Sequence, residues 1–518
     1  MKTSPLHATR FLSPFMGRVI VCVGSFALMV VEIVAGRVMA PYLGVSLYTW
    51  TGVIGTVLLG IGVGNAIGGA SADRAGSRER LGLLCIASAF VVLLVNMIPR
   101  LVNGMMLVPG VDMWFRVLAF CLVVFFPSAC VLGTLMPAVV KLTLTRLSDT
   151  GRVVGSIGAW GAIGSIVGTY AAGYWLIAFV GTGLLITLTS LALAILGCWV
   201  MGDRTLWRSR YAVSGVALLL GSAVLPSVCT QETNYYCIRV IPDPARGSGA
   251  RILRLDHLFH SYVTPSRPDL LGYSYEQVYA NLIAARVNET QPFSTLFIGG
   301  GGYVMPRYLN RFYPNASVTV AEIDPALLDV NRRLLGLPMT SPIKNVALDA
   351  RMALVTTVSD KNYDFVFGDA FNDFSVPYHL TTVEFHRLLK SRMRSDGVYA
   401  LNIIDDAAHG QFLAAMIRTL REVWQHVEVA PQADEINNGR NTYVLIASDT
   451  PLDLERWYAS HPASEQNDPE AKAAREKNLH LLLPEEIDSF LRTHPAPSLR
   501  DDYAPVDAYV APLFRDAY

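Results

Sequence analysis

Carboxylates that follow an apolar run near residue 367 are the residues best suited to do chemistry. Asp369 and Asp373 come just after the run Phe365–Phe367, and Asn372 lies between them. A carboxylate beside an amine can take its proton, which is typically worth about 10²–10⁴-fold in rate, and neighbouring carboxylates raise each other's pKa towards the useful range. The cluster therefore predicts general-base activation of an amine nucleophile, although Asp369 could also serve only as a helix cap.

A glycine-rich turn precedes this cluster in the sequence. The turn Gly299–Gly302 follows the apolar run Thr295–Ile298. Such a turn lets the backbone approach a ligand and presents the N–H groups at the start of a helix. Glu322 lies 21 residues after Gly301, the spacing at which an acid reaches a ribose diol. The combination predicts a nucleotide-type fold, with the alternative that Glu322 only closes a turn.

One short segment could form a lid or wall over both clusters. Its candidate residues are Tyr273, Tyr275, Glu276 and Tyr279. The tyrosines could equally be core residues. His260 and Arg440 are further candidates for the rim of the pocket. His379 and His386 flank Glu384, but this spacing matches no usual metal-ligand set, so no metal is expected.

The elements that must position these residues are strands alternating with helices over residues 231–450. Two short β-rich runs, 236–241 and 250–255, predict a small amino-terminal β-sheet. The main predicted strands are Thr295–Ile298, Ser317–Ala321, Phe365–Phe367, Val398–Ile403 and Thr442–Ala447, with helices such as Pro325–Leu334 and Thr382–Arg394 between them. This alternation predicts an α/β Rossmann-like domain whose parallel sheet is covered on both faces. Residues 451–518 are predicted to form a polar helical extension with a helix at Pro484–Arg492.

Residues 1–230 have a different character and predict a transmembrane domain. The whole chain is 52% hydrophobic and 16% charged, whereas a soluble chain carries about 25% charged residues. A transmembrane helix needs roughly 20 mostly apolar residues. Seven segments qualify: 19–40, 50–70, 81–98, 114–138, 153–179, 184–200 and 212–228. The prediction is therefore a seven-helix bundle.

Basic residues predict the orientation of this bundle. The loops on one side carry twelve Lys and Arg residues and those on the other side carry three, Arg37, Arg100 and Arg116. Cytoplasmic loops hold the excess of basic residues, so the amino terminus is expected in the cytoplasm of a cell-membrane protein and the part after residue 230 outside it. That part holds 27 basic and 36 acidic residues, which disfavours a nucleic-acid partner.

Two features of this half leave alternatives open. Cys229 and Cys237 flank the exit of the last predicted helix, and they form a disulfide in an oxidising compartment or remain two thiols. Glu32 lies near the middle of the first predicted helix, where an unpaired carboxylate is costly. Arg116 on another helix is a candidate partner, and a substrate-facing role for Glu32 is the alternative.

The region from Cys237 to Leu445 resembles the spermidine synthase (polyamine aminopropyltransferase) family, and more closely its membrane-fused group. The matching segments, in the family's order and spacing, are Tyr273–Tyr279, Gly299–Gly302, Glu322–Asp324, Asp349–Arg351, Asp364–Asp369, Phe371–Asp373 and Leu380–Phe385. The resemblance implies a methylthioadenosine-type pocket in a spermidine synthase/methyltransferase-type fold. Glu322 would hold the ribose, Asp349 would lie near the adenine, and Asp369 would deprotonate or orient the attacking amine.

Three positions depart from the family's pattern. The synthases carry an aspartate in the glycine turn that holds the aminopropyl ammonium of decarboxylated S-adenosylmethionine, and Gly302 takes its place here. Tyr303 replaces the next glycine, and its bulk would crowd a nucleoside lying across the turn. Asn372 matches the second catalytic-loop aspartate, unless Asp373 substitutes with a small shift. A site for a dicationic diamine has therefore lost at least one carboxylate.

The leading expectation is a membrane-anchored enzyme of this fold that activates an amine nucleophile, by resemblance for aminopropyl transfer with release of 5′-methylthioadenosine. The alternative is a cofactor-independent extracytoplasmic enzyme in which an amine attacks a carbonyl, for example an amino-terminal glutamine of an exported protein closing to pyroglutamate. A non-catalytic transporter or polyamine sensor is the third. The expected partners are the lipid bilayer and an amine-bearing small molecule or exported peptide, and a homodimer is left open.

Overall fold

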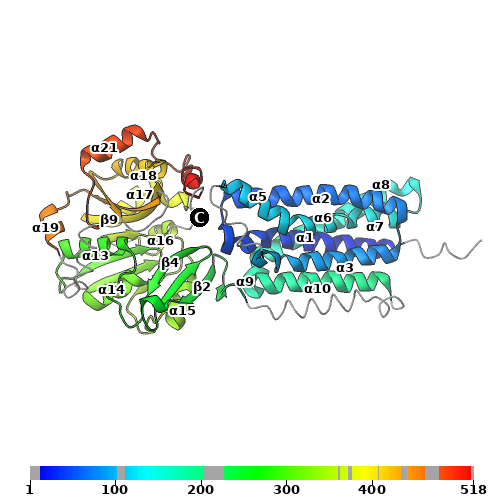
Figure 1. The fold of residues 1–518 in the computed structure, drawn as a ribbon, viewed down its shortest axis with the longest axis horizontal. Helices are drawn as coiled ribbons and strands as arrows, with labels where there is room; N and C mark the ends of the chain where they lie inside the picture. Colours follow the sequence, from blue (N-terminus) through cyan, green and yellow to red (C-terminus); the bar gives the residue numbers. More distant parts are fainter. Residues whose placement is uncertain are drawn as a thin grey trace, which may run out of the picture. The chain divides into compact units, whose positions relative to one another are not determined.

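The chain divides into two compact units, Met1–Cys237 and Ile238–Tyr518, close to the change of character after residue 230. The structure is a computed structural model that describes residues 12–101, 111–202, 227–359, 362–370, 376–406, 408–432, 440–460 and 478–514. Each unit is drawn as a ribbon in Figure 1.

Helices make up the first unit (Figure 1). They are α1 (Pro14–Leu43), α2 (Leu47–Ala75), α3 (Arg78–Leu94), α5 (Met113–Val124), α6 (Phe126–Gly133), α7 (Leu135–Thr143), α8 (Thr150–Ala171), a π-helical turn (Ala172–Leu176), α9 (Ile177–Val180) and α10 (Thr182–Met201). Five stretches are long and apolar enough to cross a membrane: Pro14–Leu43, Leu47–Arg74, Phe126–Thr143, Leu147–Leu176 and Thr182–Met201. Within the described residues the structure therefore gives five such stretches where the sequence predicts seven.

Two of the seven predicted spans are not among these five stretches, and a third is interrupted. The span predicted at 81–98 is covered only by the 17-residue α3, which ends at Leu94. The span predicted at 114–138 is broken between α5 and α6, where Pro127 follows the first residue of α6 and lacks the N–H that would continue the helical hydrogen bonds. The span predicted at 212–228 lies outside the described residues except for its last two.

The second unit contains two sheets. Strands β2 (Cys237–Pro242), β3 (Arg251–Leu255) and β4 (Leu258–Val263) pair antiparallel in a small sheet. The large sheet has seven strands in the order β10-β11-β9-β8-β5-β6-β7. Its strands are β5 (Phe293–Ile298), β6 (Ala316–Ala321), β7 (Lys344–Val346), β8 (Tyr363–Gly368), β9 (Met393–Asp406), β10 (His426–Gln432) and β11 (Arg440–Ser448). The five strands from β9 to β7 are parallel, and β11 pairs antiparallel with both β9 and β10.

Helices alternate with these strands, as in a Rossmann-like sheet. They are α13 (Ser274–Arg286), α14 (Val304–Phe312), α15 (Pro325–Leu334), α16 (Ala350–Thr356), α17 (Val383–Lys390) and α18 (Gln411–Arg421). The carboxy-terminal segment adds α19 (Leu454–Ala459), α21 (Pro484–Thr493) and α22 (Val506–Val510). The helix predicted at Thr382–Arg394 is too long, because Met393 already pairs with Tyr363 at the start of β9. Strand β4, the short strand β7 and strand β10 are absent from the sequence-based prediction.

The order of the strands reverses between β5 and β8. From β5 the chain proceeds outwards to β6 and β7, whereas β8 and β9 lie on the other side. In open α/β sheets, the loops that leave the carboxyl ends of the two strands at such a point diverge and form the binding crevice. The glycine turn follows β5 and Asp369 follows β8, so the fold brings both predicted clusters to this crevice.

Candidate active site

Asp369 lies at the first position after β8 and is held by two side chains from other elements. Its Oδ2 accepts a hydrogen bond from the Tyr275 hydroxyl at 2.8 Å, and its Oδ1 accepts one from Nδ2 of Asn402 at 3.2 Å. Solvent still reaches the residue, yet protein surrounds it, as expected on the floor of an open crevice. Desolvation by these surroundings raises the pKa of Asp369 above its ordinary value, and the two hydrogen bonds lower it in part.

The backbone at Asp369 requires the first glycine of the turn. Gly299 has a φ of 96°, and a Cβ at this position would come 2.2 Å from the carbonyl oxygen of Asp369. The amide of Asp369 donates to the carbonyl of Ile298, the last residue of β5, at 2.9 Å. Only glycine combines this conformation with this approach. The turn therefore fixes the position of the carboxylate.

A series of contacting aromatic rings leads from the small sheet to the carboxylate. Tyr262 of β4 lies 5.0 Å from Tyr273, Tyr273 lies 5.5 Å from Tyr275, and Tyr275 lies 5.5 Å from Tyr279, between ring centroids. Tyr279 also packs 4.7 Å from Phe367 and donates its hydroxyl to the Gly368 carbonyl at 3.1 Å. Tyr275 and Tyr279 are buried in the core of the unit, the alternative that the sequence left open. Together with Tyr273, which packs against this core, they form an aromatic wall next to Asp369.

Glu276 caps the start of α13 beneath this wall. Its Oε2 accepts from the amide of Tyr273 at 3.0 Å, and the side chain is 3% exposed. Burial raises the pKa of Glu276 to about 8, against the lowering effect of the backbone hydrogen bond, and the charge of Asp369 adds to the increase. The structure thus places two carboxyl groups with raised pKa values at the same end of the sheet.

Replacing Glu276 with glutamine is expected to flatten the pH dependence of stability. Between the ordinary pKa near 4.5 and the raised value near 8, the folded chain keeps a proton that the unfolded chain has released. Stability therefore falls as the pH rises through this window, with a slope of about 1.4 kcal/mol per pH unit for one proton. Glu276→Gln retains the acceptor for Tyr273 and removes this slope. Thermal unfolding of the full chain in detergent, from pH 5 to pH 8, measures this slope. A stability difference between the two proteins that stays the same across that range would contradict the prediction.

Tyr303 is fully buried between the glycine turn and the far strands of the sheet. It has a φ of 54°, a left-handed conformation that is unfavourable for a bulky residue. A Cβ at Gly300 would come 2.8 Å from Cε2 of its ring and 3.2 Å from Oε2 of Glu322. Its hydroxyl donates to Oδ1 of Asn345 in β7. The ring therefore spans from the turn after β5 towards β7, with the end of β6 between them.

Glu322, the residue after β6, is occupied by main-chain amides. Its Oε2 accepts from Gly300 at 2.7 Å and its Oε1 from Asp324 at 2.9 Å. The side chain is 5% exposed, and burial raises its pKa to about 7 although these hydrogen bonds lower it. The carboxylate closes the turn, the alternative that the sequence left open, and it presents little surface to a ribose.

Asp349, which the resemblance places near an adenine, is also engaged. Its Oδ1 accepts from the amide of Met352 at the start of α16 at 3.1 Å, and its Oδ2 contacts Nε2 of His379 at 2.7 Å. The hydrogen bond with His379 holds the pKa of Asp349 below its ordinary value. Together with the buried Tyr303 and the occupied Glu322, these contacts do not fit an adenosyl group in this half of the crevice.

Gly302 is packed directly against the small sheet. Its amide donates to Oγ of Ser261 in β4 at 2.9 Å, and a Cβ at Gly302 would come 2.6 Å from Cβ of Ser261 and 2.8 Å from Cγ2 of Val263. An aspartate at this position, as in the synthases, therefore has no space in this structure.

Gly302→Asp is expected to destabilise the protein by about 1–3 kcal/mol through overpacking and to create no aminopropyl transfer. Thermal unfolding and an assay for methylthioadenosine release measure the two effects. The double variant Ser261→Gly with Gly302→Asp removes the closest contact and should recover part of the lost stability. Full stability of the single variant, or strong transferase activity in it, would contradict this reading of the turn.

The remaining predicted site residues are placed less completely. Asn372 and Asp373 lie outside the described residues. Arg440 begins β11, opposite Asp406 in β9, and its side chain lies outside them too. In β4 the residue that reaches the turn is Ser261, the neighbour of the predicted His260. The described residues contain no group of three or more His, Cys, Asp or Glu that could hold a metal ion.

Three residues of the site were missed by the sequence analysis. Asn402 orients Asp369, Asn345 receives the Tyr303 hydroxyl, and Ser261 contacts Gly302. Asn402 is a polar residue inside the otherwise apolar predicted strand Val398–Ile403, and that is the one signal that could have identified it. Ser261 and Asn345 carry no comparable signal.

Known proteins with similar sequences include two polyamine aminopropyltransferases and an eEF1A lysine and N-terminal methyltransferase of Danio rerio, which is 33% identical over 85 residues, 16% of this chain and 12% of that protein. A probable polyamine aminopropyl transferase of Bifidobacterium longum is 26% identical over 148 residues, 28% of this chain and 32% of that protein. A polyamine aminopropyltransferase of Vibrio vulnificus is 31% identical over 121 residues, 23% of this chain and 40% of that protein. A solved structure of a probable spermidine synthase from Corynebacterium glutamicum aligns with a TM-score of 0.44 at 22% identity, over 54% of this chain and 99% of that one. No family model matches the chain.

Part of this chain is thus homologous, at low identity, to polyamine aminopropyltransferases. The chain spans about a third to two fifths of the length of these two relatives.

Proposed function

We propose that the α/β unit is an enzyme of the transferase type in which Asp369 takes a proton from an amine nucleophile. The observation that carries the proposal is the carboxylate held by Tyr275 and Asn402 at the crevice where the strand order reverses. The two hydrogen bonds orient both oxygens, and desolvation raises the pKa of Asp369, which makes the carboxylate a stronger base. The aromatic wall beside it would exclude water from an amine bound there.

Aminopropyl transfer is the first specific reaction to consider, because two of the three matched relatives are named for it. Decarboxylated S-adenosylmethionine would supply the aminopropyl group. The buried Tyr303, the occupied Glu322 and the packed Gly302 do not fit an adenosyl group, however, so this chain would need a rearranged turn to carry out the reaction.

A cofactor-independent attack of an amine on a carbonyl is the second candidate, and Tyr303 favours it. In an amino-terminal glutamine, the α-amino nitrogen would attack the side-chain amide carbon. A new C–N bond forms, the nitrogen's proton passes to Asp369, and the old C–N bond breaks as ammonia leaves with that proton. This chemistry needs the half of the crevice around Asp369 and Tyr275 and no nucleoside.

Two measurements on the full chain in detergent distinguish the reactions. Calorimetry with 5′-methylthioadenosine tests the first, and mass spectrometry of glutaminyl peptides, which lose one ammonia on cyclisation, tests the second. Nucleoside binding with no loss of ammonia supports aminopropyl transfer, and loss of ammonia without nucleoside binding supports cyclisation. If neither occurs and Asp369→Asn retains full cellular function, the unit is a non-catalytic transporter or sensor module and the proposal fails.

We also propose that the first unit anchors this enzyme in the cell membrane, with the α/β unit outside the cytoplasm. Large apolar side chains such as Leu58, Ile166 and Ile195 are exposed on the helices, which suits contact with lipid better than contact with water. Cys229 and Cys237 form a disulfide in the structure, a bond typical of oxidising compartments.

A reporter fused after Tyr518 tests the location of the α/β unit. Alkaline phosphatase is expected to be active there and green fluorescent protein is expected to be dark. The reverse pattern would contradict the extracytoplasmic location and would make a supply of adenosyl compounds available to the crevice.

A further inference from the structure

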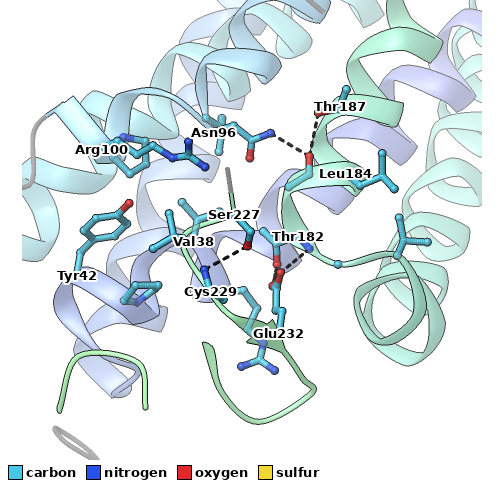
Figure 2. A pocket seen from close by; sticks show the side chains of 18 of the residues that line it. Val38, Tyr42, Asn96, Arg100, Thr182, Leu184, Thr187, Ser227, Cys229 and Glu232 are labelled. Atoms are coloured by element: carbon cyan, nitrogen blue, oxygen red, sulfur yellow. Dashed lines mark hydrogen bonds between the residues drawn. The ribbon is translucent and has the colours of Figure 1, made fainter. Parts of the chain in front are cut away.

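A cavity of about 590 Å³ lies in the first unit, where several helices end. Figure 2 shows its side chains. They come from the end of α1, from the segment after α3, from the start of α10 and from residues 227–232. The cavity has the size of a typical small-molecule site, and no residue of the α/β crevice lines it.

Two of the charged side chains that line this cavity, those of Glu232 and Arg37, already have partners within the protein. Glu232 caps α10: its Oε2 accepts from the amide of Thr182 at 2.9 Å, and its Oε1 accepts from the hydroxyl of the same residue (Figure 2). Arg37 donates to the carbonyl of Thr233 and interacts electrostatically with Glu232. These contacts occupy the carboxylate and the first guanidinium.

Arg100 is the charge that remains. It lines the same cavity, and none of the hydrogen bonds or ion pairs among the described residues neutralises its guanidinium. Among the described lining residues, two arginines and one glutamate carry one net positive charge. A guanidinium binds a phosphate or carboxylate through two parallel hydrogen bonds, so one anionic group would complete the charge balance.

The rest of the lining mixes polar side chains, such as Asn96 and Thr187, with apolar ones. Among the apolar residues Val95 is buried, whereas Phe179 and Leu184 are 84% and 54% exposed and form an apolar wall. A small inorganic anion would leave most of this surface unfilled. A ligand that joins one negative charge to an apolar chain would fill both parts.

We propose that this cavity binds the phosphate diester of an anionic lipid, with Arg100 holding the phosphate and the apolar wall holding the start of the chain. Basic pockets between membrane helices bind anionic head groups in this way. The inference rests on the proposed membrane anchoring, because only then do lipids reach the cavity. The reporter fusion tests the anchoring separately.

Native mass spectrometry of the full chain in an uncharged detergent tests the proposal with short-chain phosphatidylglycerol. The protein should bind one such lipid at least tenfold more tightly than phosphatidylcholine of equal chain length, and inorganic phosphate at the same concentration should not displace it. Arg100→Gln should reduce the affinity to that for phosphatidylcholine, and Arg100→Lys should retain part of it. Arg152→Gln is the matched control, because Arg152 is 81% exposed and lies at the start of α8, away from the cavity lining.

Three results would overturn the inference. They are equal binding of the two lipids, displacement by inorganic phosphate alone, which would reveal a site for free anions, and undiminished phosphatidylglycerol binding by Arg100→Gln. If Arg100→Gln does not fold, Leu184→Trp decides instead. This variant keeps the charge and narrows the apolar wall, so it should lose lipid affinity, and unchanged affinity would refute the proposed site.

Discussion

Replacing Asp369 with asparagine is expected to reduce turnover by about 10²–10⁴-fold, the usual contribution of a positioned general base. Asparagine preserves the size of the side chain and an acceptor for Tyr275, so the crevice should stay folded. The measurement is the rate of product formation by the full chain, in whichever of the two assays the unmodified protein is active. Thermal unfolding confirms that the variant is intact.

A matched control lies at the other end of the same strand. Asp364 accepts hydrogen bonds from Ser294 at 2.8 Å, far from the carboxyl end of β8, and Asp364→Asn should leave the rate within a few-fold. If both variants lose activity equally, the effect is structural and Asp369 is not the base.

Removing the Tyr275 hydroxyl tests the role of Asp369 by shifting its pKa instead of removing its charge. Its hydrogen bond lowers the pKa of Asp369, so Tyr275→Phe should raise that pKa further. Because the base must be deprotonated, activity falls as the pH drops through this pKa, and the acid limb of the rate profile should shift to higher pH. A rate loss that is equal at all pH values would indicate that Tyr275 only packs against the site.

Replacing Tyr303 with glycine is expected to open the nucleoside half of the crevice. Removing the ring frees the space beside Gly300 and Glu322, and glycine adopts the left-handed conformation without strain. Calorimetry of the full-length variant should then detect binding of 5′-methylthioadenosine. The unmodified protein should not bind this nucleoside at millimolar concentrations. The loss of a large buried side chain costs about 3–5 kcal/mol, and relief of the backbone offsets about 1–2 kcal/mol, so the variant should unfold at a lower temperature.

Tyr303→Phe is the control for this gain. It keeps the ring in place and removes only the hydrogen bond to Asn345, so it should still exclude the nucleoside. Two results would show that the ring is no obstacle: tight nucleoside binding by the unmodified protein, or equal binding by the phenylalanine and glycine variants. Either result would make aminopropyl transfer the favoured reaction.

The amino-acid sequence alone determined the α/β architecture around the crevice. Each predicted main strand falls on an observed strand, because buried strands are continuous apolar runs that a sequence displays directly. The prediction of a parallel sheet is wrong for Thr442–Ala447, which lies in the antiparallel strand β11. The position of Asp369 and of the glycine turn follows, since both come directly after such strands and the carboxyl ends of parallel strands meet at one edge. The apolar stretches of the first unit were recognisable in the same way, although their breaks at Leu94 and Pro127 were not anticipated.

Only the tertiary structure decided what the crevice admits. Tyr275 reaches Asp369 across 94 residues of sequence, Tyr303 reaches Asn345 across 42, and Gly302 contacts Ser261 across 41. No local pattern encodes the direction of such a side chain, because it depends on the packing of elements that are distant in sequence. The sequence showed that residue 303 is a tyrosine, but only the assembled sheet buries this side chain against Glu322. That burial decides whether the amine site also has room for a nucleoside.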